Sequence, residues 1–109
     1  LEQVLSGRIK LLAGGDKIYY NEKGEYHRED GPAIDYYDSG SWYINGKLHR
    51  EDGPARCNRS LTEWYKHGKL HREDGPAATR PSWHNVPDRY FIDGEELTKE
   101  EFDERRSRT

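Results

Sequence analysis

The stretch His27-Arg28-Glu29-Asp30-Gly31-Pro32-Ala33 decides the fold, because the same seven residues return as His49–Ala55 and again as His71–Ala77. The spacings are equal, since 49 − 27 and 71 − 49 are both 22. Self-similarity at a fixed period of this length indicates one supersecondary unit stacked on copies of itself. The sequence therefore predicts a tandem array.

The residues before each heptapeptide repeat as well. The second and third units read WYINGKLH from Trp42 and WYKHGKLH from Trp64. A weaker first copy, YNEKGEYH, aligns from Tyr20, and a partial fourth copy, YFIDGEEL, starts at Tyr90 without a heptapeptide. The array thus holds three full units and one incomplete unit.

Each unit carries the signals of a β-hairpin. Asn45-Gly46 and Asp93-Gly94 favour a two-residue turn in which both residues take positive φ. By strand parity we expect Trp42, Ile44 and Leu48 on one face. The Asp-Gly-Pro step interrupts the strand, and we expect its glycine to supply an unusual φ for a regular bend.

These signals predict an all-β fold of tandem antiparallel β-hairpin repeats with a 22-residue period, forming an elongated curved sheet with a short C-terminal capping helix. We expect one repeat domain over 1–109, with an N-terminal cap at 1–16, hairpin repeats at 17–97 and the helix at 98–106. Thr98 and Glu101 have the spacing of a capping box, and Phe102 is the expected anchor. A first strand is expected around Arg8–Leu12.

Composition supports a folded but thin protein. Hydrophobic residues make up 31% and aromatic residues 12%, with a net charge of −3, whereas disordered chains combine few aromatics with high net charge. Cys57 is the single cysteine, so we expect a reducing, cytoplasmic location. The chain has no Met, so Leu1 is not expected to be the native start. Its apolar runs are too short for a membrane span.

The phrase NGKLHREDGPA at residues 45–55 resembles the MORN repeat, in the divergent form of bacteria, phages and giant viruses. Residues 68–77 match this phrase from the glycine onward, and 27–33 match its second half. The resemblance covers about residues 17–97 and departs from standard MORN repeats, in which Gly usually follows the His. It implies an extended antiparallel sheet that serves as a non-catalytic binding or assembly scaffold. By analogy it also suggests inhibitor or antitoxin roles.

The charged heptapeptide is expected to be structural rather than catalytic or metal-binding. Zinc ligands must converge to about 2.0–2.2 Å from one ion, whereas equivalent residues of neighbouring units lie roughly 10 Å apart. No nucleophile recurs beside the histidines, so we expect no enzyme activity and no cofactor or metal. The predicted framework positions are His27, Asp30, Gly31, His49, Asp52, Gly53, His71, Asp74 and Gly75.

The segments between heptapeptides vary, and a constant frame with variable strands is typical of a recognition surface. The leading hypothesis is a protein-binding module, with Tyr36, Arg56, Arg59, Arg80, Trp83 and His84 as candidate partner contacts. A self-assembling scaffold, such as a homodimer, is an alternative. A third hypothesis is nucleic-acid binding by arginines beside aromatic residues, which the sequence pI of about 6.0 disfavours.

Overall fold

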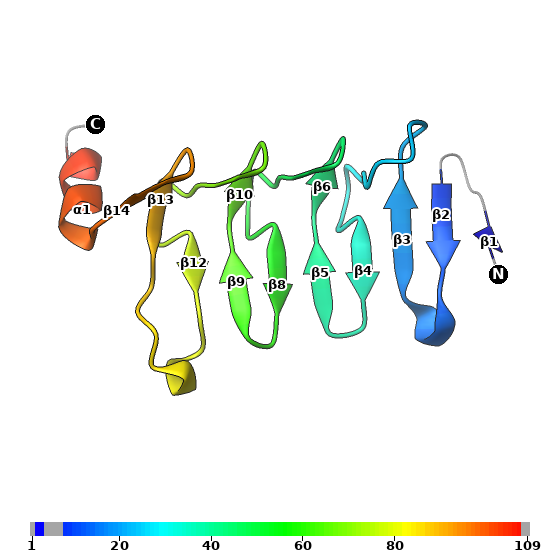
Figure 1. Cartoon of the computed structure of the whole chain (residues 1–109), viewed down its shortest axis with the longest axis horizontal. Helices are drawn as coiled ribbons and strands as arrows, with labels where there is room; N and C mark the ends of the chain where they lie inside the picture. Colours follow the sequence, from blue (N-terminus) through cyan, green and yellow to red (C-terminus); the bar gives the residue numbers. More distant parts are fainter. Residues whose placement is uncertain (1, 4–7, 108–109) are drawn as a thin grey trace.

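The chain forms a long, thin single layer of β-strands with one helix at its C-terminal end (Figure 1). The computed structural model describes residues 2–3 and 8–107, so part of the expected N-terminal cap at 1–16 lies outside the described residues. The principal extents are 50 × 31 × 17 Å. The all-β antiparallel class and the C-terminal helix are confirmed, and the sheet is open at both ends.

The main sheet has eight antiparallel strands in the order β1-β2-β3-β4-β5-β8-β9-β12. The strand expected around Arg8–Leu12 is β2. The bounds are β1 Glu2–Gln3, β2 Arg8–Leu11, β3 Lys17–Tyr20, β4 Ile34–Tyr36, β5 Ser39–Ser41, β8 Arg56–Asn58, β9 Leu61–Glu63 and β12 Ala78–Thr79.

Three short hairpins, each a separate two-stranded sheet, lie along the upper edge of the main sheet in Figure 1. They pair β6 Tyr43–Ile44 with β7 Lys47–Leu48, β10 Tyr65–Lys66 with β11 Lys69–Leu70, and β13 Tyr90–Ile92 with β14 Glu95–Leu97. Two 3₁₀ turns, η1 Ala13–Gly15 and η2 Ser82–His84, lie on the opposite edge. A unit therefore contributes two strands to the main sheet and a second, shorter hairpin above it.

The predicted two-residue turns are confirmed by their backbone angles. Asn45 and Gly46 have φ of 48° and 81°, and Asp93 and Gly94 have 51° and 83°. His67 takes the same conformation at 52°, although histidine is a weaker turn signal than Asn or Asp. Positive φ at both central residues matches the right-handed twist of the two flanking strands.

The expected facing of the hairpin side chains is wrong. Tyr43 pairs with Leu48 and Ile44 pairs with Lys47, and directly paired residues share a face. Across a two-residue turn, the residue numbers of paired positions differ by an odd number. The even–odd rule that holds along one strand therefore reverses on the second strand. Leu48 therefore lies with Tyr43, on the face opposite Ile44.

The first unit also differs from its sequence alignment. The amide of Tyr19 donates to Ala33 O at 2.7 Å, as Trp42 does to Ala55 O at 2.6 Å. Tyr19, rather than Tyr20, is thus the equivalent of Trp42. The reason is a longer turn, which Asn21 closes by donating to Glu25 O at 2.9 Å.

Four of the seven buried hydrophobic residues in the described part of the chain are alanines. Ala33, Ala55 and Ala77, the last residues of the three heptapeptides, are each fully buried. Near the C-terminal end, Ala77 and Ala78 form one cluster with Phe91, against which Trp64 and Leu70 pack. The alanine that ends each heptapeptide is therefore a core position of its unit.

Helix α1, Lys99–Ser107, closes the last hairpin. Its N-terminus has the predicted capping box: Thr98 N donates to Glu101 Oε1 at 2.8 Å, and Glu101 N donates to Thr98 Oγ1 at 3.1 Å. Phe102 is 2% exposed, with its ring 4.9 Å from that of Tyr90. The helix is therefore anchored where the sequence predicted.

Candidate functional site

The arginine of each heptapeptide is held between an aromatic ring and a glycine. The Arg50 guanidinium lies 3.9 Å above the Trp42 ring. Its Nε donates to Asp52 Oδ1 at 3.0 Å and its Nη1 donates to Pro54 O at 3.2 Å. Arg28 over Tyr19 and Arg72 over Trp64 repeat this arrangement at 4.0 and 3.9 Å.

The glycine of the heptapeptide provides space rather than an unusual φ. Gly31, Gly53 and Gly75 are not among the positive-φ glycines, so the expected role is wrong. A Cβ on Gly53 would lie 2.8 Å from Arg50 Cζ, and the other two positions give 2.7 and 2.9 Å from the equivalent atom. These contacts are too short for a methyl group, so the guanidinium can stack only against glycine.

Each histidine joins its unit to the next one. The Nδ1 atoms of His27, His49 and His71 accept from the backbone amides of Asn45, His67 and Asp93, each at 2.9 Å. The Nε2 atoms lie 3.4, 2.7 and 3.2 Å from Glu29, Glu51 and Glu73. Since Nδ1 accepts, the ring proton lies on Nε2 and points to the carboxylate.

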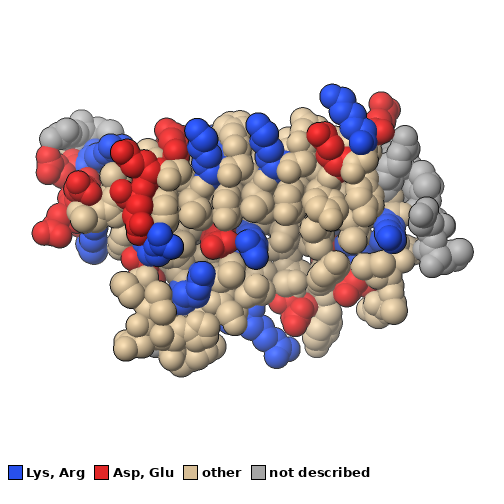
Figure 2. Space-filling model, in the orientation of Figure 1, with Lys and Arg blue, Asp and Glu red and all other residues tan. Residues whose placement is uncertain are grey.

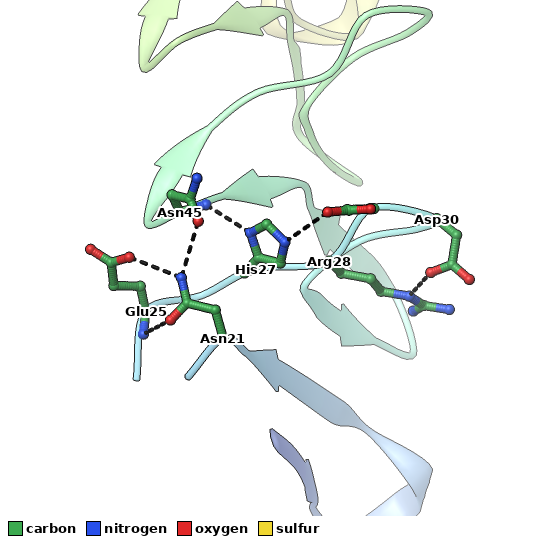
Figure 3. Close-up of polar contacts among 7 residues, drawn as sticks. Asn21, Glu25, His27, Arg28, Asp30 and Asn45 are labelled. Atoms are coloured by element: carbon green, nitrogen blue, oxygen red, sulfur yellow. Dashed lines mark hydrogen bonds and ion pairs between the residues drawn. The ribbon is translucent and has the colours of Figure 1, made fainter. Parts of the chain in front are cut away.

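The link between the first two units is shown in Figure 3. His27 lies between the Asn45 amide and a carboxylate, while Arg28 turns away toward Asp30. The Asn21 side chain adds a bond to Asn45 Oδ1 at 3.2 Å. With both imidazole nitrogens occupied, the histidines act as connectors and offer no lone pair to a metal.

The paired carboxylates have shifted pKa values. The hydrogen bond from Arg28 is the main reason that the pKa of Asp30 lies below its usual value, and Arg72 has the same effect on Asp74. The pKa of Glu51 is lowered first by its hydrogen bond with His49 and then by the charge of Lys66. Their side chains nevertheless remain 67–88% exposed.

Two hollows lie between successive heptapeptides. The Trp64 hollow, of about 410 Å³, is lined by Arg50, Glu51, Asp52, Trp64, Lys66, His71, Arg72, Glu73 and Asp74. The Trp42 hollow, of about 660 Å³, is lined by Arg28, Glu29, Asp30, Trp42, Ile44, His49, Arg50, Glu51 and Asp52. Sequence reasoning identified the charged residues but missed these hollows. The clue was an aromatic residue seven positions before each heptapeptide in the second and third units.

The predicted partner contacts fall mainly on what we name the loop edge, formed by residues 36–39, 58–61 and 80–88. These segments line the lower edge of the sheet in Figure 1, opposite the short hairpins. Tyr36 is 37% and Trp83 76% exposed, and the Trp83 ring lies 6.1 Å from that of His84. Arg59 lies between them in the turn that joins β8 to β9.

The sequence missed Tyr37, which is 91% exposed in the turn between β4 and β5. The signal was present, since Tyr37 directly precedes Asp38-Ser39-Gly40, a turn-forming run. The other predicted arginines have internal partners. Arg56 lies 3.6 Å from Glu63, and Arg80 donates to Thr79 O at 3.3 Å.

Charge does not define a broad patch on the face drawn in Figure 2. Basic and acidic side chains are mixed along its upper edge, and acidic groups gather toward the helix end. Among residues 2–3 and 8–107, no group of three His, Cys, Asp or Glu side chains could hold a metal ion. Nor does that part of the chain contain a helix long and apolar enough to cross a bilayer.

Comparison of the chain with protein-family models, curated proteins and solved structures found no match.

Proposed function

We propose that this chain is a non-enzymatic, MORN-like repeat module that binds another protein through its loop edge. In this proposal the 22-residue units form a curved array in the cytoplasm, and binding inhibits the partner, as an antitoxin or phage inhibitor does. The sheet holds the loops in place, and the loops make the contact.

The distribution of exposed apolar side chains is the observation that carries the proposal. Tyr36, Tyr37, Trp83 and Val86 are four of the five large hydrophobic side chains exposed in the described part of the chain, at 37, 91, 76 and 48%. All four belong to the loop edge. Exposed aromatic residues grouped on one side of a protein are typical of interaction hot spots.

The internal contacts of the heptapeptide side chains support the same proposal. Its Arg, His, Gly and Ala are engaged in stacking, inter-unit bonds, close packing and the core, as described above. Two strand spacings separate neighbouring units, or about 10 Å. The turns of the loop edge therefore present different residues at regular intervals on a common frame.

Affinity capture with Trp83→Ala and Tyr37→Ala tests this proposal. Both variants should recover less of a captured partner than the wild type, because each removes an exposed aromatic side chain from the loop edge. Lys23→Ala is the matched control, since Lys23 is exposed in the first unit's hairpin turn, on the opposite edge. Equal recovery by all four proteins would reject the loop edge as the binding surface.

Self-assembly is the competing function, and the 17 Å thickness favours it, because the described residues form no second layer over the sheet. Sedimentation across a concentration series separates the two functions. A mass that rises to that of a dimer, without a captured partner, would support the scaffold. A constant monomer mass would support partner binding. Nucleic-acid binding has less support, because Arg56 and Arg89 are paired with Glu63 and Glu96.

A further inference from the structure

The two hollows are copies of each other that differ at one position. Moving each of the nine residues that line the Trp42 hollow forward by 22 gives the nine that line the Trp64 hollow. Eight of these nine pairs have the same residue type. The exception is Ile44, whose counterpart is Lys66. The protein thus contains its own comparison of the same site with and without a cation.

In the Trp64 hollow, the chain supplies this cation itself. Lys66 Nζ lies 3.8 Å from Glu51 Oε1, and its charge contributes to the lowered pKa of Glu51, after the hydrogen bond with His49. The wall of the Trp64 hollow therefore already carries an ammonium group beside Glu51.

In the Trp42 hollow, no lysine or arginine of residues 2–3 and 8–107 forms an ion pair with the equivalent carboxylate, Glu29. Glu29 is 82% exposed and contacts His27 at 3.4 Å, while Ile44 replaces the lysine with an apolar wall. Four carboxylates and two arginines line this hollow, a formal balance of −2, whereas Lys66 raises the balance of the Trp64 hollow to −1. The space is also larger, at about 660 against 410 Å³.

We propose that the Trp42 hollow binds a lysine or arginine side chain of a partner protein, in the place that Lys66 occupies in the Trp64 hollow. This inference rests on the proposed protein-binding function and names the chemistry of one contact, on a surface distinct from the loop edge.

The lining suits both ends of such a side chain. Its aliphatic stem would lie against Trp42 and Ile44, and its charged head would reach Glu29, as long cationic side chains bury their stems and keep the head at a polar group. Arg28 and Arg50 do not compete for this place, because each is held by its own Asp at 3.0 Å and by stacking on an aromatic ring.

NMR with a short cationic probe tests the proposal. The probe is the blocked tripeptide acetyl-Gly-Arg-Gly-amide, and acetyl-Gly-Glu-Gly-amide is the matched control. The wild-type indole N–H signal of Trp42 should shift with the arginine peptide, saturate in the millimolar range and ignore the glutamate peptide. The signal of Trp64 should shift far less, because Lys66 already places a cation beside Glu51 and makes that hollow less negative.

Two exchanged variants make the test specific. Ile44→Lys should abolish the Trp42 response, and Lys66→Ile should create a response at Trp64 comparable to that of wild-type Trp42. If Ile44→Lys loses its native spectrum, the Lys66→Ile arm decides alone, because a gained response cannot arise from misfolding.

Equal shifts of both tryptophans in the wild type would overturn the inference, since they would indicate general charge attraction. Absence of any Trp42 shift would do the same. A Trp42 signal that moves when the protein alone is concentrated would assign the hollow to a second copy of this chain. Failure of the loop-edge capture test, with these NMR results intact, would reject the proposed loop edge and keep the cation site.

Discussion

Replacing Gly53 with alanine should destabilise the protein only while Arg50 is present. In the wild type, the new Cβ would stand 2.8 Å from Arg50 Cζ and displace the guanidinium from Trp42. The stacking is worth about 0.5–1 kcal/mol. The charged hydrogen bond to the Pro54 carbonyl adds about 1.5–2 kcal/mol at the lower end of its usual range. The total loss is thus about 2–3 kcal/mol.

Part of this loss is offset in the unfolded state. Alanine restricts the unfolded chain more than glycine does, which stabilises a protein by about 0.4–1 kcal/mol where the native φ suits alanine. Gly53 has no positive φ, so this gain applies. We therefore expect Gly53→Ala to lower the free energy of unfolding by about 1–2.5 kcal/mol in the wild type.

The Arg50→Ala background reverses the expected sign. Arg50→Ala removes the three atoms nearest to the new Cβ, so Gly53→Ala should then raise the free energy of unfolding by about 0.4–1 kcal/mol. Urea unfolding of the four proteins, followed by tryptophan fluorescence, measures this double-mutant cycle. An equal cost in both backgrounds would refute the reasoning and return the glycine to a role in backbone conformation.

Three smaller perturbations test other contacts. His49→Asn retains an acceptor near the position of Nδ1, so its free energy of unfolding should exceed that of His49→Gln by about 1 kcal/mol. The difference would appear as a higher urea midpoint, and equal midpoints would contradict the inter-unit bond. The lowered pKa of Asp30 gives stability that is present above the ordinary value of 3.8 and lost as pH falls through the lower folded value. Carboxyl NMR should therefore place its midpoint below 3.8, and Arg28→Gln should raise that midpoint. Thr98→Ala should cost about 0.5–2 kcal/mol of helix stability, seen as faster hydrogen exchange at Glu101; unchanged exchange would reject the cap.

Local signals in the sequence predicted the local structure well. Asn45-Gly46 and Asp93-Gly94 take the predicted turn conformation. The capping box at Thr98 forms as its spacing indicates. Such features depend on a few adjacent residues, whose backbone preferences are strong enough to be read without tertiary contacts.

The errors arose where contacts join distant residues. The stacking of Arg50 on Trp42 and the space it needs at Gly53 involve three separate segments. A glycine before proline in the sequence is equally compatible with an unusual φ. In the first unit, one extra turn residue shifted the alignment, so Tyr20 was matched where Tyr19 belongs.

The candidate site was predictable only in part. Trp83 was identified from its loop between two prolines, and it is exposed. Tyr37 was missed, because a pair of tyrosines at a strand end does not reveal which one enters the turn. The two hollows were missed as well, since they exist only where neighbouring units meet.

The bonds that join the units run both ways along the chain. The amides of Asn45 and Gly46 donate back to His27 Nδ1 and Tyr26 O, while Arg28 N donates forward to Tyr43 O. Each unit therefore has donors and acceptors that only the following unit satisfies. During synthesis the array can lengthen from the ribosome one unit at a time, and these groups become paired as each following turn emerges.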